Sequence, residues 1–137
     1  MRAKVYLQKI TFYNSRIESN LERIKLYKES AENRTSNLSP NKVQTSSSKQ
    51  KMADAVCAYS DLESIVKVLE NNRQNIIDTI SLLNPYESTV LHKCYVDGKT
   101  LWEISREMDR SYSWVTKVHS NGVKGIQEIL DNKEEVG

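Results

Sequence analysis

The stretch TLWEISREMDRSYSWVTKV, residues 100–118, contains the clearest helix signals of the C-terminal part of the chain. Thr100 precedes an apolar helical pattern, and Glu103 follows three residues later, which is the pattern of a capping box at a helix start. Asp109 then interrupts the apolar spacing, and Ser111 can cap a second helix. The stretch therefore predicts two helices separated by a tight turn.

Apolar residues keep helical spacing on both sides of this turn. They are Leu101, Ile104 and Met108 before it, and Val115, Val118, Val123, Ile126, Ile129 and Leu130 after it. A further helix over 85–96 is predicted by Asn84, which can cap it, and Pro85, which suits the first helical position. Gly98 can adopt the positive φ that ends this helix. We therefore expect a domain of three helices over residues 84–137.

Two long amphipathic helices are predicted over residues 3–33 and 50–83. Their apolar side chains alternate between three- and four-residue steps, as in the seam of a coiled coil. The seam positions are Leu7, Ile10, Asn14, Ile17, Leu21, Ile24, Lys28 and Ala31, then Tyr59, Leu62, Val66, Leu69, Arg73, Ile76, Ile80 and Leu83. Leu26 would widen the first stripe. A Ser- and Thr-rich stretch at 34–50 predicts the loop between the two helices.

The expected fold is thus all-α, with a long helical hairpin over residues 1–83 and a three-helix domain over 84–137. The hairpin can close on itself, pair with a second copy as a coiled coil, or do both. Asn14 interrupts its first seam. A polar residue there either fixes the register or the number of chains, or lies at a splayed edge and specifies nothing.

The composition excludes several classes of protein. With 28% charged and 38% hydrophobic residues among 137, the chain has the profile of a soluble helical protein. No apolar run approaches the roughly 18 residues of a membrane span, and the start lacks a signal core, so we expect a cytoplasmic protein. Cys57 and Cys94 form no CxxC pair, so we expect two buried reduced thiols and no metal site. Without a catalytic set or phosphate loop, neither an enzyme nor a cofactor is expected.

Polar and aromatic side chains occupy the first turns of the helix after Ser111. They are Tyr112, Ser113, Trp114, Thr116 and Lys117. A short helix, a tight turn and a second helix with a polar leading face are typical of a helix-turn-helix. In that motif the second helix enters a major groove about 12 Å wide, where its side chains reach base edges. These residues are therefore candidates for DNA contacts.

The local charge agrees with this interpretation, although residues 84–137 hold 7 Lys/Arg against 9 Asp/Glu. From Arg110 to Gln127 the chain has three Lys/Arg residues and no acidic residue. Lys99 and Thr100 can add phosphate contacts at the preceding helix start. We expect Trp102 to pack between helices or against the long helices.

Residues 87–130, ESTVLHKCYVDGKTLWEISREMDRSYSWVTKVHSNGVKGIQEIL, resemble region 4 of bacterial sigma-70 factors. The matching positions are Leu91, Tyr95, Gly98, Glu103, Ile104, Ser105, Met108, Ser111 and Val115. The order of long helix, loop, long helix and terminal module is similar to small phage regulators of the ArpU/RinA kind, which activate late genes. The resemblance implies that Tyr112, Ser113 and Lys117 face base edges, and that Trp114 and Thr116 touch the DNA backbone.

The sequence departs from the sigma pattern at several positions. Asp109 replaces the turn glycine, which Asp can do because it tolerates the left-handed region. Ser105 replaces a small Ala, a change from which we expect no consequence. Gly122 and Gly125 stand where helix formers are usual, at a cost of about 1 kcal/mol each. That half of the helix is expected to be either flexible or closely packed, and the absence of leading-face arginines leaves the base preference open.

The resemblance implies a sequence-specific regulator of transcription in a bacterial cytoplasm, encoded by a phage or prophage and acting at late promoters. Double-stranded DNA would be its partner, with RNA polymerase as a second candidate, and the long helices would form a homodimer. Two alternatives stay open. One is a DNA-packaging protein of the small-terminase type, and the other is a factor that binds RNA polymerase without touching DNA. A large ring of subunits would favour packaging, and a monomer or dimer would favour regulation.

Overall fold

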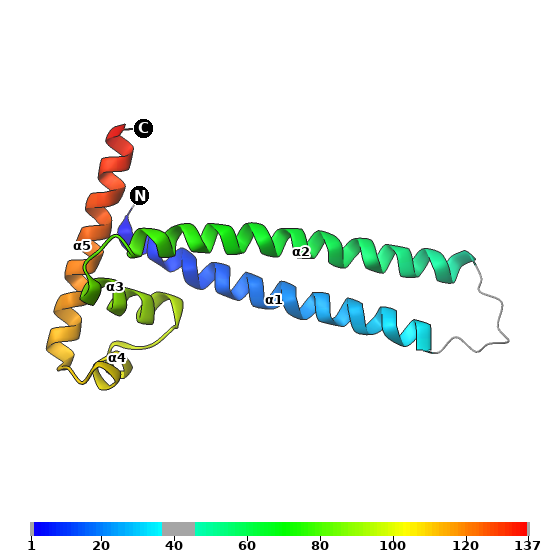
Figure 1. The fold of residues 1–137 in the computed structure, drawn as a ribbon, viewed down its shortest axis with the longest axis horizontal. Coiled ribbons are helices and arrows are strands. Elements are labelled where there is room, and N and C mark those ends of the chain that lie inside the picture. Colours follow the sequence, from blue (N-terminus) through cyan, green and yellow to red (C-terminus); the bar gives the residue numbers. More distant parts are fainter. Residues whose placement is uncertain (1, 37–45, 137) are drawn as a thin grey trace. The chain divides into compact units, whose positions relative to one another are not determined.

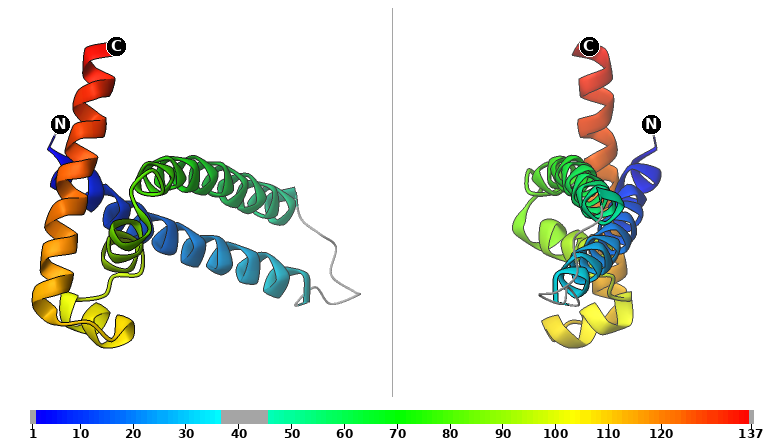
Figure 2. Two further views of the ribbon diagram at one scale, coloured as in Figure 1. Left: turned by 60° about the vertical axis from the view of Figure 1, so that its left-hand side comes forward. Right: turned by 90° about the vertical axis from the view of Figure 1, so that its right-hand side faces the viewer.

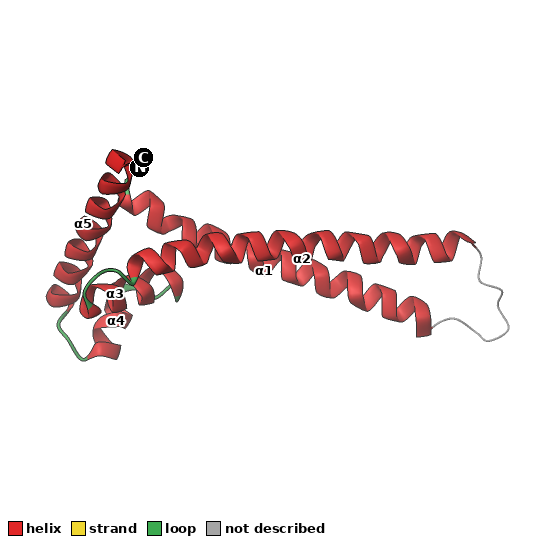
Figure 3. Ribbon diagram, turned by 45° about the horizontal axis from the view of Figure 1, so that its top comes forward, coloured by secondary structure: helices red, strands yellow, loops and turns green. Residues whose placement is uncertain are grey.

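The computed structural model describes the backbone of residues 2–36 and 46–136, and within these residues the fold is all-helical (Figures 1 and 3). The elements in chain order are α1 (Ala3–Ser36), α2 (Ser46–Ile80), α3 (Pro85–Leu91), the π-helical turn η1 (His92–Val96), α4 (Leu101–Met108) and α5 (Tyr112–Val136). The all-α prediction is therefore confirmed for the described residues. None of the described helices is long and apolar enough to cross a membrane.

The long helices differ from their predicted bounds mainly at the loop between them. Because α1 runs to Ser36 and α2 begins at Ser46, both helices extend into the loop expected at 34–50. Residues 37–45 of that loop lie outside the described residues. At its other end α2 stops at Ile80, three residues earlier than predicted, and a turn leads to Asn84.

The chain forms two compact units, residues 15–70 and residues 1–14 together with 71–137. Both boundaries fall inside the long helices, whereas the sequence suggested a division between residues 83 and 84. The first turns of α1 and the last turns of α2 therefore belong to the same unit as α3, α4 and α5.

In the unit of residues 15–70, α1 and α2 lie side by side (Figures 1 and 2). Its buried apolar side chains are Ile17, Ile24, Ala55 and Val66. Lys28 lies with its Nζ 3.2 Å from Glu63 Oε1 and 5.4 Å from the centre of the Tyr59 ring. Lys28 can therefore occupy a seam position, because its ammonium group contacts Glu63 and Tyr59 on the neighbouring helix.

Leu21 and Leu26 were predicted to lie on the buried apolar stripe of α1, but both side chains are exposed. Leu21 belongs to the heptad lane that begins at Leu7, which is fully buried. An α-helix with 3.6 residues per turn drifts by about 20° per heptad from a strict seven-residue repeat. By the third position of this lane the side chain has turned away from α2, while the lane of Ile17 and Ile24 stays buried.

The larger unit has a core that joins sequence-distant elements. Its buried residues are Ala3, Leu7 and Ile10 of α1, Ile76 and Ile80 of α2, Leu91, Tyr95, Ile126 and Leu130. Fully burying one Leu or Ile side chain contributes about 1.5–3 kcal/mol. A smaller cluster of Val90, Ile104 and Val115 holds α3, α4 and α5 together. Residues of α3, η1 and α5 therefore share the main core with the ends of the long helices, whereas α4 packs through the smaller cluster.

Asn14 meets partners within its own unit. Its Nδ2 donates to the carbonyl of Val96 at 3.2 Å, and its Oδ1 accepts from Arg73 Nη1 at 2.8 Å. Asn14 therefore does not lie at a splayed edge. Its amide is bonded to Val96 and Arg73 of the same chain rather than to a second copy. Arg73 is the polar interruption of the α2 seam, so the two interruptions pair with each other.

The thiols differ from the prediction at one position. Cys94 is half-buried, and burial raises the pKa of its thiol, but Cys57 is exposed. Cys57 stands two residues after the buried Ala55. Two residues turn a helix by about 200°, which places the thiol on the opposite side. No group of three or more His, Cys, Asp or Glu side chains within the described residues could hold a metal ion.

Gly122 and Gly125 allow α5 to approach neighbouring side chains closely. A Cβ atom at Gly122 would lie 3.1 Å from Leu91 Cδ1, and one at Gly125 would lie 2.8 Å from Leu83 Cδ2. Of the two predicted alternatives for this half of the helix, close packing is therefore the one found.

We predict opposite effects for alanine at these two glycines. Both substitutions gain up to about 1 kcal/mol of helix propensity. At Gly122 the obstacle is Leu91, which is fully buried and cannot yield, so Gly122→Ala should lower Tm. At Gly125 the obstacle is the end of the half-buried Leu83 side chain, which can rotate, so Gly125→Ala should preserve or raise Tm. Thermal unfolding followed by circular dichroism measures both, and equal stabilisation would contradict the packing at Leu91.

Candidate nucleic-acid interface

A tight turn joins α4 to α5 and fixes where α5 begins. Asp109 adopts φ 53° in the left-handed region, as expected for the residue in the place of glycine. Ser105 Oγ donates to the Arg110 carbonyl at 2.6 Å, and Ser111 Oγ accepts from the Trp114 N–H at 3.1 Å. Ser105, from which no effect was expected, thus fastens the turn.

The capping residues of the preceding helices act as predicted. Asn84 Oδ1 accepts from the Glu87 N–H at 2.9 Å, and Thr100 Oγ1 accepts from the Glu103 N–H at 3.2 Å. Thr100 also donates to the Glu103 carboxylate at 3.2 Å, so the two side chains bond directly. Gly98 before them has φ 71°. The starts of α3, α4 and α5 are therefore set by local side chains.

The outward face of α5 carries short polar and cationic side chains. Its exposed members at the spacing of one helical face are Ser113, Lys117, Ser120 and Lys124. The chain has no acidic residue from Tyr112 to Gln127, and Glu128 and Asp131 are the first anions that follow along this face of α5. Ser120 and Lys124 were not singled out from the sequence, although continuing the same spacing from Ser113 and Lys117 would have found them.

Two aromatic rings stack where α4 and α5 begin. The rings of Trp102 and Tyr112 lie 4.2 Å apart between centroids and 16° from parallel. The Trp102 side chain is 61% exposed and Tyr112 is 37% exposed. Trp102 was expected to pack between helices or against the long helices; its ring instead stays mostly exposed and contacts Tyr112 of α5. Trp102 lies two residues before the buried Ile104 and so points away from the core face of α4.

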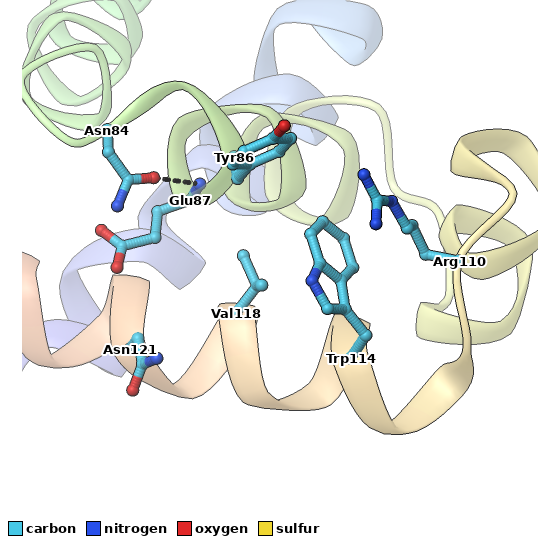
Figure 4. Close-up of a pocket in the computed structure, with 7 residues that line it drawn as sticks. All are labelled: Asn84, Tyr86, Glu87, Arg110, Trp114, Val118 and Asn121. Carbon is cyan, nitrogen blue, oxygen red and sulfur yellow. Dashed lines mark hydrogen bonds between the residues drawn. The ribbon is translucent and has the colours of Figure 1, made fainter.

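Trp114 belongs largely to the fold. It is half-buried against the cluster of Val90, Ile104 and Val115, and its ring meets Tyr86 edge-to-face with centroids 5.6 Å apart. The Arg110 guanidinium lies 4.9 Å above the centre of the Trp114 ring, within cation–π range. Trp114 and Arg110 line an open depression of about 300 Å³ (Figure 4). Its lining residues are Asn84, Tyr86, Glu87, Arg110, Trp114, Val118 and Asn121.

Three other predicted contact residues have partners within the chain. Thr116 is half-buried, and its hydroxyl donates to the Tyr112 carbonyl at 2.8 Å. Thr100 is bonded to Glu103. Lys99 pairs with Glu107; this hydrogen bond raises the pKa of the Lys99 ammonium and lowers the pKa of the Glu107 carboxyl. Ser113 and Lys117 thus share the outward face of α5, whereas Tyr112 lies about 140° around the helix from Lys117 and stacks on Trp102. Lys99 and Thr100 lie at the start of α4.

His119 lies on the inner side of α5, where it faces Tyr95. The Tyr95 hydroxyl and His119 Nε2 are 3.0 Å apart, and the rings stack with centroids 5.7 Å apart. Burial lowers the pKa of His119, with a further contribution from the charge of Lys4, so the imidazole is neutral at pH 7. Burial, and secondly Cys94, raises the pKa of Tyr95 to about 12. His119 therefore supplies packing and a hydrogen bond rather than a charge.

We predict that acid destabilises the protein partly through His119. Its pKa is lower in the folded than in the unfolded chain, so the unfolded chain binds the proton more readily. The associated stability is complete above the unfolded value of about 6.5 and is lost as the pH falls through the folded pKa. Tm of the wild type should fall between about pH 7.5 and 5, and His119→Gln should reduce that fall. His92→Gln is the matched control, and an identical fall in both variants would contradict the assignment.

The two tryptophans should differ strongly in accessibility. Trp114→Phe leaves the exposed Trp102 as the single reporter, and Trp102→Phe leaves the half-buried Trp114. Because acrylamide quenches by collision, the first variant should be quenched more steeply and emit at longer wavelength. Equal quenching constants would show that the Trp102–Tyr112 stack is covered in solution.

Comparisons with protein-family models, with curated proteins and with solved structures found no match for this chain. Function is therefore inferred from the residues of α4 and α5 and from the groups that surround them.

Proposed function

We propose that the protein is a sequence-specific regulator of transcription that binds double-stranded DNA. In this proposal α4 and α5 form a helix-turn-helix, and α5 is the helix that enters the major groove. The observation that carries the proposal is the outward face of α5. Ser113, Lys117, Ser120 and Lys124 are exposed there on a helix with no acidic residue until Glu128.

The spacing of this face suits a groove. Ser113 and Lys124 are 11 residues apart, which is about 16 Å along a helix, and the groove is about 12 Å wide. Side chains near the start of α5 would then reach base edges, and a lysine farther along would reach a phosphate. The hydroxyl of Ser113 and the ring edge of Tyr112 are the base-reading groups we favour, with Lys117 between base and phosphate.

Trp114 and Arg110 receive a different role in this proposal. Trp114 packs against Tyr86 and the core, so it positions α5 rather than touching DNA. Arg110 is exposed above the Trp114 ring and can reach a phosphate without leaving it. Thr116, Lys99 and Thr100 already have partners within the chain, so we assign them at most secondary contacts.

One copy of this face would bind weakly. Each neutralised phosphate contributes a salt slope of only about −0.9, and α5 offers only Lys117 and Lys124 on its outward face. Two copies on adjacent half-sites would double these contacts and raise the affinity by linkage. The proposal therefore includes a homodimer through the long-helix region of residues 1–83.

The biological setting comes from the sequence resemblance to sigma-70 region 4 and to phage regulators of the ArpU/RinA kind. We infer a phage or prophage activator of late genes in the cytoplasm of a bacterial host, acting at promoters beside RNA polymerase.

A selection from randomised duplex DNA tests this function. The full-length protein should enrich a defined sequence, and fluorescence anisotropy should then measure its affinity over a salt series. Lys117→Ala should weaken binding and reduce the salt slope by up to about one unit, since it removes one phosphate contact. Lys67→Ala, which removes an exposed lysine of α2, is the matched control and should bind like the wild type. Failure to enrich any duplex would reject the function.

A further inference from the structure

The first turns of α1 are fixed against α5. The Ala3 N–H donates to Gln127 Oε1 at 2.8 Å across 124 residues of sequence. Gln127 is itself oriented by a bond from its Nε2 to Asp131 Oδ1 at 2.9 Å. Ala3 is buried in the same core cluster as Ile126 and Leu130 of α5. The start of α1 therefore has a defined place beside the middle of α5 (Figures 1 and 2).

This start of α1 is basic. Residues 2–17 contain four Lys/Arg residues and no acidic residue. Within the same compact unit as α5, Arg2 and Lys4 are exposed. Lys4 lies near enough to His119 for its charge to lower the pKa of the imidazole. Gln127 is 15 residues after Tyr112, so the bond from Ala3 places the start of α1 about 22 Å along α5 from the beginning of that helix.

The position of Gln127 defines the side of α5 on which the basic segment lies. Residues three or four apart on a helix are neighbours. Gln127 is three residues after Lys124 and seven after Ser120, so its side chain lies next to both. Both Ser120 and Lys124 are exposed. The start of α1 therefore packs on the inner side of α5 at Ile126 and Leu130 and reaches the edge of the outward face at Gln127.

We propose that the start of α1 is part of the DNA-binding surface, with Arg2 and Lys4 contacting phosphates of the strand that borders α5. The inference rests on the proposed function and deepens it. A helix in the major groove has a phosphate strand on each side, because the groove is only about 12 Å wide. The base-reading side chains lie at the start of α5, and the basic segment stands farther along, where a bordering strand passes.

This arrangement also supplies the charge that α5 lacks. Residues 84–137 hold 7 Lys/Arg against 9 Asp/Glu, and an excess of anions opposes binding to DNA. Arg2 and Lys4 add two exposed cations beside the outward face of α5. A DNA interface assembled from both ends of the sequence would therefore have about twice the phosphate contacts of the α5 face alone.

The test uses the full chain and the duplex enriched by the wild type. The double variant Arg2→Gln, Lys4→Gln should reduce the salt slope by up to about two units, and the affinity by up to about eightfold per residue near 0.1 M salt. Lys25→Gln, at an exposed position of the same helix outside this unit, should leave both values unchanged. Both proposed positions are exposed, so Tm should also stay unchanged.

A second measurement needs no variant of the binding surface. His92 and His119 are the only histidines of the chain, so their imidazole signals can be followed by NMR and assigned with His119→Gln. A phosphate beside Lys4 would screen its charge, so DNA should raise the pKa of His119 in the wild type. The imidazole signals of His92 provide the internal control.

The outcomes separate the two proposals. If the double variant keeps the salt slope of the wild type and DNA leaves the pKa of His119 unchanged, the proposed role of α1 is wrong. The variant Lys117→Ala would still test the proposed function of α5. Absence of duplex binding by the wild type would overturn both. Binding of an acidic protein but no duplex would likewise overturn the assignment to DNA.

Discussion

The close approach of α5 to α3 is the contact on which the rest of the larger unit depends. Gly122 has no side chain, so Leu91 can lie where a Cβ would otherwise be. This brings Ile126 and Leu130 into one core with Leu7 and Ile80, and the same packing leaves the opposite side of α5 exposed. A buried side and an outward polar side of α5 are thus two results of one contact, and the polar side is the one proposed for DNA.

Local rules predicted much of this fold from the sequence. The helix starts at Asn84, Thr100 and Ser111 follow from side chains that bond to backbone within three residues, and such bonds need no tertiary context. The left-handed residue Asp109 was equally local. The exposure of Leu21 could not be predicted in this way. A strict seven-residue repeat assumes that its positions stay on one side of the helix, but a helix with 3.6 residues per turn drifts away from that repeat.

Distant pairings could not be predicted in this way. Asn14 and Arg73 each interrupt a seam, but nothing in either pattern says that they meet. The candidate site shows the same limit. Ser113 and Lys117 follow from helical spacing, whereas the stack of Trp102 on Tyr112 depends on how two helix starts converge. The place of Ala3 beside Gln127 had no local signal at all, since 124 residues separate them.

The bond between Ala3 and Gln127 also has a consequence for folding kinetics. Helical proteins usually fold fast because their contacts are close in sequence. Here the core unites α1 with α5, and 124 residues separate Ala3 from Gln127, so the entropy of closing a very long loop must be overcome before the two helices stabilise each other. On the ribosome the apolar side chains of Ala3, Leu7 and Ile10 would stay exposed to chaperones or to a neighbouring nascent chain until α5 is synthesised. Completion of the core thus depends on the arrival of the same helix that is proposed to bind DNA.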